Sequence, residues 1–129
     1  MYLLDTNICI DFVDGRNVRA QQKVRDNYPK GLHVSMITAA ELLVGPKTSD
    51  DPQGDKVKVE RFLSTLTLHD FDRATAEIYG EMARSIGVKR SSFDRLIAAH
   101  ALQLGFTLVT NNAKHFSDVP GLRVENWTV

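Results

Sequence analysis

The sequence contains no long hydrophobic run, only one cysteine, and no excess of charge of either sign. No apolar stretch approaches the roughly 20 residues that span a bilayer, so we expect a soluble protein without a membrane segment. A single cysteine, Cys9, excludes an internal disulfide, and Met1 to Asp5 lacks the basic and apolar regions of a secretory signal. Both features predict a cytoplasmic location. Because 16 basic residues balance 16 acidic ones, any nucleic-acid site must be local.

Several familiar motifs are also missing. Neither common glycine-rich phosphate loop occurs, which argues against a nucleotide-dependent enzyme. His100 and His115 lack a partner at zinc-ligand spacing, so we interpret them as packed or solvated. Cys9 has no nearby His motif and is predicted to be a buried, unreactive thiol. The 129 residues, 43% of them hydrophobic and 25% charged, fit one domain over residues 1–129.

Short apolar runs alternate with helical patterns along the chain. Strands are predicted at 2–5, 32–35, 66–71, 107–110 and 122–127. Helices are predicted at 6–13, 20–27 and 93–104, with Thr6 or Asn7 capping the first of these and Ser91 or Ser92 the last. Three more are predicted: one that follows the second strand and runs through Leu43, one that ends near residues 62–66, and one that Asp72 caps and that runs to Ile86. The polar segment 47–55 is predicted to be a loop. This order favours an α/β domain with a mostly parallel sheet.

Polar side chains are expected to meet at the carboxyl edge of that sheet, where such domains bind ligands. Asp5 ends the first strand, and Glu41 lies early in the helix after the second. Asp94 begins the helix that leads back to the strand at 107–110, and Asn112 follows that strand. The sequence therefore predicts a cluster of three acids and one amide.

Such a cluster favours a hard divalent cation. Carboxylates held close together repel one another and stay ionised only when positive charge lies among them. Mg²⁺ and Mn²⁺ prefer carboxylate oxygen, and they activate water for phosphodiester hydrolysis. Each residue also has a simpler interpretation: Asp5 as a helix cap, Glu41 as part of a capping box with Thr38, and Asn112 as a turn residue. Asp94 is less easily explained in this way, since it shares a helix face with Ile97.

A local basic segment flanks Asp94. Residues 84–95 contain one acid, Asp94, and four basic residues: Arg84, Lys89, Arg90 and Arg95. Lys89, Arg90 and Arg95 are therefore candidate contacts for RNA phosphates, although a solvated basic loop fits as well. Single-stranded or looped RNA suits a shallow acidic site better than a rigid duplex.

Five blocks of the sequence together resemble the PIN-domain toxins of the VapC family. They are Leu3-Leu4-Asp5-Thr6-Asn7, Ser35-Met36-Ile37-Thr38-Ala39-Ala40-Glu41-Leu42, Phe93-Asp94-Arg95-Leu96-Ile97-Ala98-Ala99-His100-Ala101, Leu108-Val109-Thr110-Asn111-Asn112 and Pro120-Gly121-Leu122-Arg123-Val124-Glu125-Asn126-Trp127. Their order and spacing agree with that family over the whole chain.

The resemblance implies a three-layer α/β/α PIN-like fold and an endoribonuclease that depends on Mg²⁺ or Mn²⁺. It implies a toxin that inhibits translation, forms a homodimer, is held inactive by a VapB-type antitoxin, and cuts RNA, with tRNA favoured over ribosomal RNA. By position, Asp5 and Asp94 are the principal metal ligands, Glu41 is the third acid, and Thr6 orients Asp5. Many PIN domains have Asp where Asn112 stands, and some relatives have Glu at the position of His115. The uncharged Asn112 favours one tightly bound metal rather than two.

Two alternatives remain open. The first is a non-catalytic module that binds RNA or protein through a degenerate acidic site, and the three retained acids argue against it. The second is a receiver-type phosphoacceptor domain, which requires an acid beside Asp5 and a Lys ending the strand at 107–110, and the sequence has neither. Cleavage of DNA instead of RNA also remains chemically possible, because carboxylates and metal do not read the 2′-hydroxyl.

Overall fold

The structure of the protein is a computed structural model that describes residues 1–46 and 48–129. Within these ranges the chain forms five β-strands, six α-helices and two short 3-10 helices. The strands are β1 (Tyr2–Leu4), β2 (Leu32–Ser35), β3 (Thr67–His69), β4 (Thr107–Val109) and β5 (Val124–Glu125). The helices are α1 (Thr6–Asp14), α2 (Val18–Asn27), η1 (Tyr28–Lys30), α3 (Met36–Val44), α4 (Pro52–Leu63), α5 (Arg73–Ile86), α6 (Asp94–Leu104) and η2 (Ala113–Phe116).

The strands form one parallel sheet in the order β3-β2-β1-β4-β5. In its centre, β1 pairs with β2 on one side and β4 on the other, with Leu3 opposite His33 and Leu108. After β1 the chain adds β2 and β3 on one side, and it later returns to add β4 and β5 on the other side. The carboxyl end of β1 is therefore a topological switch point, which is where α/β sheets bind ligands.

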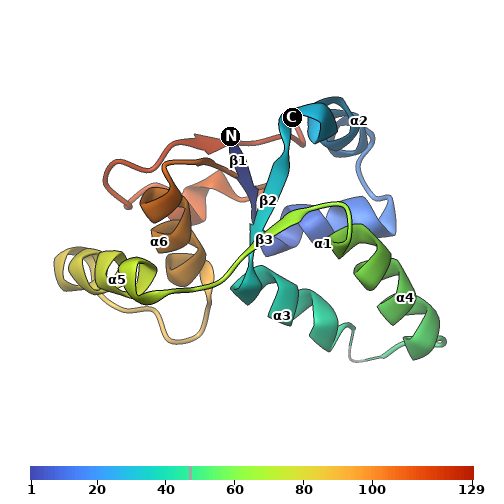
Figure 1. Cartoon of the computed structure of the whole chain (residues 1–129), viewed down its shortest axis with the longest axis horizontal. Coiled ribbons are helices and arrows are strands. Elements are labelled where there is room, and N and C mark those ends of the chain that lie inside the picture. The colour runs from blue at the N-terminus through green and yellow to red at the C-terminus, as the bar shows by residue number, and fades with distance from the viewer. Residues whose placement is uncertain (47) are drawn as a thin grey trace.

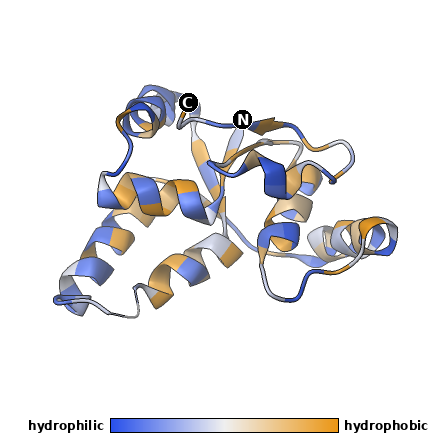
Figure 2. Ribbon diagram, turned by 180° about the vertical axis from the view of Figure 1, so that it is seen from behind, coloured by the Kyte–Doolittle hydropathy of each residue, from blue (hydrophilic) through white to orange (hydrophobic). Residues whose placement is uncertain are grey.

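Helices cover both faces of this sheet, as expected for a three-layer α/β/α domain (Figure 1). Leu4, Val34 and Val109 pack against residues of α1, α2, α3 and α4, whereas Leu3 and Leu108 pack against α5 and α6. Adjacent residues of one strand point to opposite faces, so the central strands β1 and β4 supply both cores. Figure 2 shows hydrophobic residues recurring along α1, α3 and α6, while α2 is almost entirely hydrophilic. None of the helices in the described ranges is long and apolar enough to cross a membrane.

The predicted order of elements is confirmed, but several predicted boundaries are wrong. Helix α1 is capped by Asp5, whose Oδ1 accepts a hydrogen bond from the Ile8 amide at 2.9 Å, and not by Thr6 or Asn7. Helix α3 begins after Ser35, whose hydroxyl accepts from the Ile37 amide at 3.1 Å. Thr38 is therefore inside the helix, and the capping box predicted for Thr38 and Glu41 does not form.

Two further boundaries differ from the prediction. Helix α4 starts at Pro52, inside the segment predicted as a loop, because Asp51 accepts a hydrogen bond from the Gly54 amide and proline suits the first helical turn. Lys47, which begins that predicted loop, lies outside the described residues. Helix α6 starts at Asp94, one residue later than predicted, and the hydroxyl of Ser92 accepts from the Asp94 amide at 3.1 Å.

Candidate active site at the carboxyl edge of the sheet

Asp5 lies at the centre of the carboxyl edge, directly after β1. Its side chain is only 2% exposed, and it caps α1. The pKa of this carboxyl is raised from its ordinary value of 3.8 to about 6, mainly by burial and to a smaller extent by the negative charges of Asp94 and Glu41. Hydrogen bonds from the Thr110 hydroxyl and the Ile8 amide act in the opposite direction. The charges of the other two predicted acids thus act on Asp5 across the sheet edge.

Glu41 reaches this edge from α3 and is held by α1. The Thr6 hydroxyl donates a hydrogen bond of 2.6 Å to Glu41 Oε1 and lies 3.3 Å from the Thr38 hydroxyl. The family resemblance implies that Thr6 orients Asp5, but the hydrogen bond of its hydroxyl goes to Glu41. The reason is that Asp5 occupies the cap position, which places Thr6 on the first turn of α1, facing α3.

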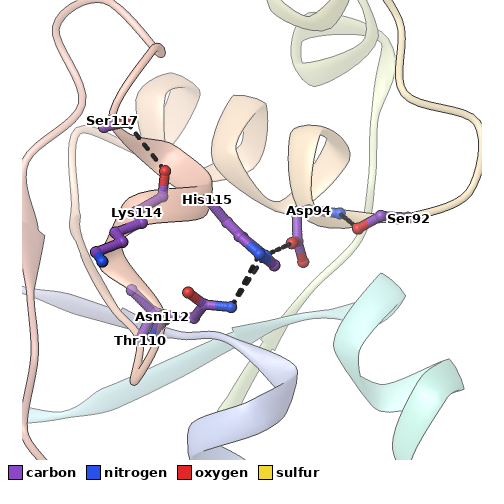
Figure 3. A network of polar contacts seen from close by, with 7 residues as sticks. All are labelled: Ser92, Asp94, Thr110, Asn112, Lys114, His115 and Ser117. Atoms are coloured by element: carbon purple, nitrogen blue, oxygen red, sulfur yellow. Dashed lines mark hydrogen bonds and ion pairs between the residues drawn. The ribbon is translucent and has the colours of Figure 1, made fainter.

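Asp94 is the first residue of α6, and its side chain meets the turn that follows β4. His115 Nδ1 lies 3.3 Å from Asp94 Oδ2, and the Asn112 amide nitrogen lies 3.1 Å from the His115 ring (Figure 3). The structure therefore brings His115 into contact with two predicted site residues. Spacing alone predicted a packed or solvated His115, since its partner Asp94 lies 21 residues away.

Glu41, Asp94 and His115 line one open pocket of about 350 Å³, together with Asn7, Arg90, Ser91, Ser92 and Phe93. Carboxylate oxygens on such a pocket are suitable ligands for Mg²⁺ or Mn²⁺. In the part of the chain that the structure describes, however, no three His, Cys, Asp or Glu side chains converge closely enough to hold a metal as they stand. The acids are thus neighbours at one edge, with Asp94 turned towards His115.

The predicted basic contacts occupy three different environments. Arg90 lines the pocket beside Asp94. Lys89 lies near Asp118 and contributes to the lowered pKa of that carboxyl, which results mainly from its hydrogen bond with Arg95. Arg95 is only 6% exposed and pairs with Asp118 at 2.9 Å. The prediction that Arg95 contacts RNA phosphates is therefore wrong, because its guanidinium group faces the interior.

Cys9 and His100, which we interpret as structural, are buried. Cys9 is a buried free thiol, and burial raises its pKa well above the ordinary value, which disfavours the reactive thiolate. His100 is 1% exposed and packs edge-on against Phe71 at a ring distance of 5.6 Å. These positions agree with the prediction that neither residue belongs to the acidic site.

One contact at the site has no signal in the local sequence. The Asn111 amide donates a hydrogen bond of 2.7 Å to Asp11 Oδ2 on α1, across a separation of 100 residues. This bond ties the turn that carries Asn112 to the helix that begins at Asp5. Sequence patterns find residues that are close along the chain, and this pair becomes visible only in the folded sheet.

Comparisons with known proteins agree with this architecture. The PIN domain family matches residues 2–122. The chain is 35% identical over 131 residues to the tRNA(fMet)-specific endonuclease VapC of Shigella flexneri, covering 98% of both proteins. It is 37% identical over 129 residues to Ribonuclease VapC2 of Haemophilus influenzae, covering 98% of this chain and 97% of that protein.

A solved structure gives the same result. The crystal structure of VapBC2 from Rickettsia felis, bound to a DNA fragment from its promoter, superimposes with a TM-score of 0.86. The sequence identity is 33%, and the superposition covers 98% of each chain. The match thus extends over the whole sheet and all the elements that carry the candidate site. The chain belongs to the PIN-domain family and, within it, to the VapC ribonucleases.

Proposed function

We propose that this protein is an endoribonuclease that depends on Mg²⁺ or Mn²⁺, with Asp5, Glu41 and Asp94 as the metal ligands. The observation that carries the proposal is the state of Asp5, whose pKa is raised to about 6 by burial and by the other two acids. A cation among these groups would offset a repulsion that the fold otherwise leaves in place. Thr6 would keep Glu41 turned towards the ion, and Asn112 would offer a carbonyl oxygen or position a water beside Asp94.

The donor set fits such an ion. All three ligands offer carboxylate oxygen, and Glu41 and Asp94 share one solvent-accessible pocket that leaves room for substrate phosphate. The bound metal would activate water and neutralise charge on the phosphoryl group during phosphodiester hydrolysis. Arg90, on the rim of the pocket, would hold an adjacent phosphate, with Lys89 next to it in the chain. We favour one tightly held metal, since Asn112 brings no charge.

For the substrate we propose tRNA. The Shigella flexneri relative is named for its specificity towards tRNA(fMet), and it matches this chain over 98% of both sequences. The acidic pocket is open and not deep, which suits a looped, single-stranded segment such as those of a folded tRNA. Cutting tRNA would inhibit translation, as expected for the toxin of a toxin–antitoxin pair acting in the cytoplasm.

We further propose a VapB-type antitoxin as the partner and a homodimer as the oligomeric state. A largely apolar groove of about 280 Å³ between α1, α3 and α4 includes Ile10, Leu43 and Val44, and it adjoins the acidic site through Glu41. Leu43 and Val44 are exposed in the isolated chain. An apolar segment of an antitoxin would cover this groove, and a basic side chain following it would reach the acids and compete with the metal.

Cleavage of total cellular RNA by the purified chain tests the function. We expect discrete cuts with Mg²⁺ or Mn²⁺ that disappear in EDTA and fall by at least about 100-fold in Asp94→Asn, because removal of a transition-state charge partner typically costs that much. Glu77→Gln changes an exposed acid on α5 that pairs only with Arg73 at 3.4 Å, and it serves as the matched control. Mapping the ends of the products identifies the RNA.

Three results would contradict the proposal in different ways. Equal cutting by wild type and Asp94→Asn would place the activity elsewhere or in a contaminant. Cutting that persists in EDTA would remove the metal from the mechanism. RNA binding without cutting, in both proteins and with either metal, would favour the non-catalytic module with a degenerate acidic site.

A further inference from the structure

Phe93 is a large apolar side chain exposed at the rim of the acidic pocket. It is 51% exposed, and it lines the same pocket as Asp94 and Glu41. In the described part of the chain its ring stacks on no other aromatic ring, whereas the buried and half-buried aromatic rings form several edge-on and tilted pairs. An unpaired aromatic face is thus presented to solvent directly beside a predicted metal ligand.

Local stability does not account for a phenylalanine at this position. Phe93 occupies the N-cap of α6, where Ser, Thr, Asp or Asn would stabilise the helix, and its side chain makes no capping bond. The Ser92 hydroxyl instead accepts a hydrogen bond from the Asp94 amide at the start of the helix (Figure 3). The core-facing side of α6 is completed by Ile97, Ala98 and Ala101, all fully buried. Neither the cap nor the core therefore requires the ring.

The surroundings of the ring match the chemistry of a nucleotide. Arg90 lies on the same pocket and carries a permanent positive charge with a planar group that binds phosphate. An aromatic face and a neighbouring Arg are the two elements with which proteins hold unpaired nucleotides, the ring stacking on the base and the cation contacting the backbone. Stacking of this kind tolerates any base, because every base has a flat face.

We propose that Phe93 is the stacking platform for an unpaired base next to the phosphate that is cut, with Arg90 contacting the adjacent phosphate. This inference rests on the proposed function, since it names the form of RNA that the same site accepts. It makes Phe93 a positioning residue that acts through the base and does not touch the reacting atoms. It also predicts a preference for single-stranded or looped RNA, because a base inside a duplex has no free face.

Binding in EDTA separates this inference from catalysis. The probe is a single-stranded RNA of about ten nucleotides, a length within the range bound by single-strand binding folds, in which 2-aminopurine replaces one base at a time. We expect one or two positions to be quenched by stacking on wild type. Phe93→Leu, which keeps an apolar side chain without a flat face, should abolish that quenching and weaken binding about tenfold. Phe93→Trp should retain both.

Two controls make the reading specific. Val18→Ala removes an apolar side chain that is 84% exposed on α2, and it should leave binding and quenching unchanged. A duplex of the same sequence should bind wild type and Phe93→Leu equally. With Mn²⁺ restored, Phe93→Leu should raise KM for a single-stranded substrate and change kcat little, which is the signature of lost substrate binding.

Equal affinity and equal quenching in wild type and Phe93→Leu would overturn the inference. So would loss of affinity in both Phe93→Leu and Phe93→Trp without any quenched position in wild type. If Phe93→Leu instead impaired only binding of an antitoxin peptide, the exposed ring would be a protein contact. The proposed function fails separately, when wild type binds and quenches the probe but cuts no RNA with either metal.

Discussion

At the residue scale, Asp5 caps α1 and is also a proposed metal ligand, and it does both from a buried position that disfavours its charged form. As the cap of α1 it accepts the Ile8 amide, which either a carboxylate or a neutral amide oxygen can do. As a metal ligand it must be ionised. Because it is 2% exposed and near two other acids, its pKa is raised to about 6, so the folded chain favours its neutral form. The metal-free protein therefore carries a destabilising charge at neutral pH.

Replacement of Asp5 by Asn should reveal this cost. A pKa raised from 3.8 to about 6 corresponds to about 3 kcal/mol, present below pH 3.8 and lost as the pH rises through about 6. In EDTA near pH 8, Asp5→Asn should therefore be more stable than wild type by about 1–3 kcal/mol, and the difference should shrink near pH 5. Urea denaturation at both pH values measures it.

Bound metal should reverse the order of stability of wild type and Asp5→Asn. Mn²⁺ should stabilise wild type, because it binds the folded site, and it should leave Asp5→Asn unchanged. Glu77→Gln again serves as the control, since this exposed acid should change neither stability nor its response to metal. If Asp5→Asn were less stable than wild type in EDTA near pH 8, the buried carboxylate would not destabilise the folded chain.

At the element scale, α1 and α3 are joined at the site by the bond from the Thr6 hydroxyl to Glu41 at 2.6 Å. The change Thr6→Val removes the hydroxyl and keeps the shape of the side chain. We expect metal affinity and cleavage to fall about 10- to 100-fold, the usual effect of losing a hydrogen bond that orients a ligand. The cap of α1 stays intact, since Asp5 provides it.

Calorimetric titration with Mn²⁺ and cleavage assays measure the two effects of Thr6→Val. Thr6→Ser restores the hydroxyl and should recover most of both, whereas a purely steric role would leave the valine variant, which keeps the shape, unimpaired and would impair the smaller serine variant. If Thr6→Val bound metal as tightly as wild type, Glu41 would not depend on α1 for its position.

The elements also mark what the sequence can and cannot predict. Strand–helix alternation and the placement of Asp5, Glu41 and Asp94 at one edge follow from local patterns and from the rule for parallel sheets. The choice between neighbouring caps does not: the sequence allows Asp5 as well as Thr6 or Asn7 to cap α1, and the structure has the bond at Asp5. For α3 the sequence indicates Thr38, whereas Ser35 makes the capping bond. The burial of Arg95 was missed because its partner Asp118 lies 23 residues away.

At the scale of the whole molecule, a histidine cluster joins β2, β3 and α6, which are far apart in the sequence. His33 on β2 lies 2.8 Å from His69 on β3, ring nitrogen to ring nitrogen, so one ring donates and the other accepts. His100 on α6 packs edge-on to His69, and Phe106 covers His33 and His69. Protonation of both rings of the close pair would leave two N–H donors facing each other. The cluster is therefore stable in its neutral form.

Acid should weaken the fold through this cluster. Burial, and after it the charge of His69, lowers the pKa of both His33 and His100. The amino group of Met1 also lowers the pKa of His33, whereas Asp72 partly offsets the lowering at His100. A lowered pKa in the folded state means that the unfolded chain binds more protons, so this contribution is present above the ordinary value of 6.5 and is lost as the pH falls below it. The direction is opposite to that of Asp5.

The two contributions can be separated in the Asp5→Asn background, where the carboxylate no longer titrates. Urea denaturation in that background should show stability falling between about pH 7.5 and about pH 5.5. His100→Gln, which is neutral throughout and keeps a polar side chain, should flatten that decline, even where the variant is less stable at every pH. An unchanged slope would mean that His100 stays neutral in both states or is charged in both. His100 would then not contribute to the loss of stability in acid, and His33, whose pKa is also lowered, would be the next group to test.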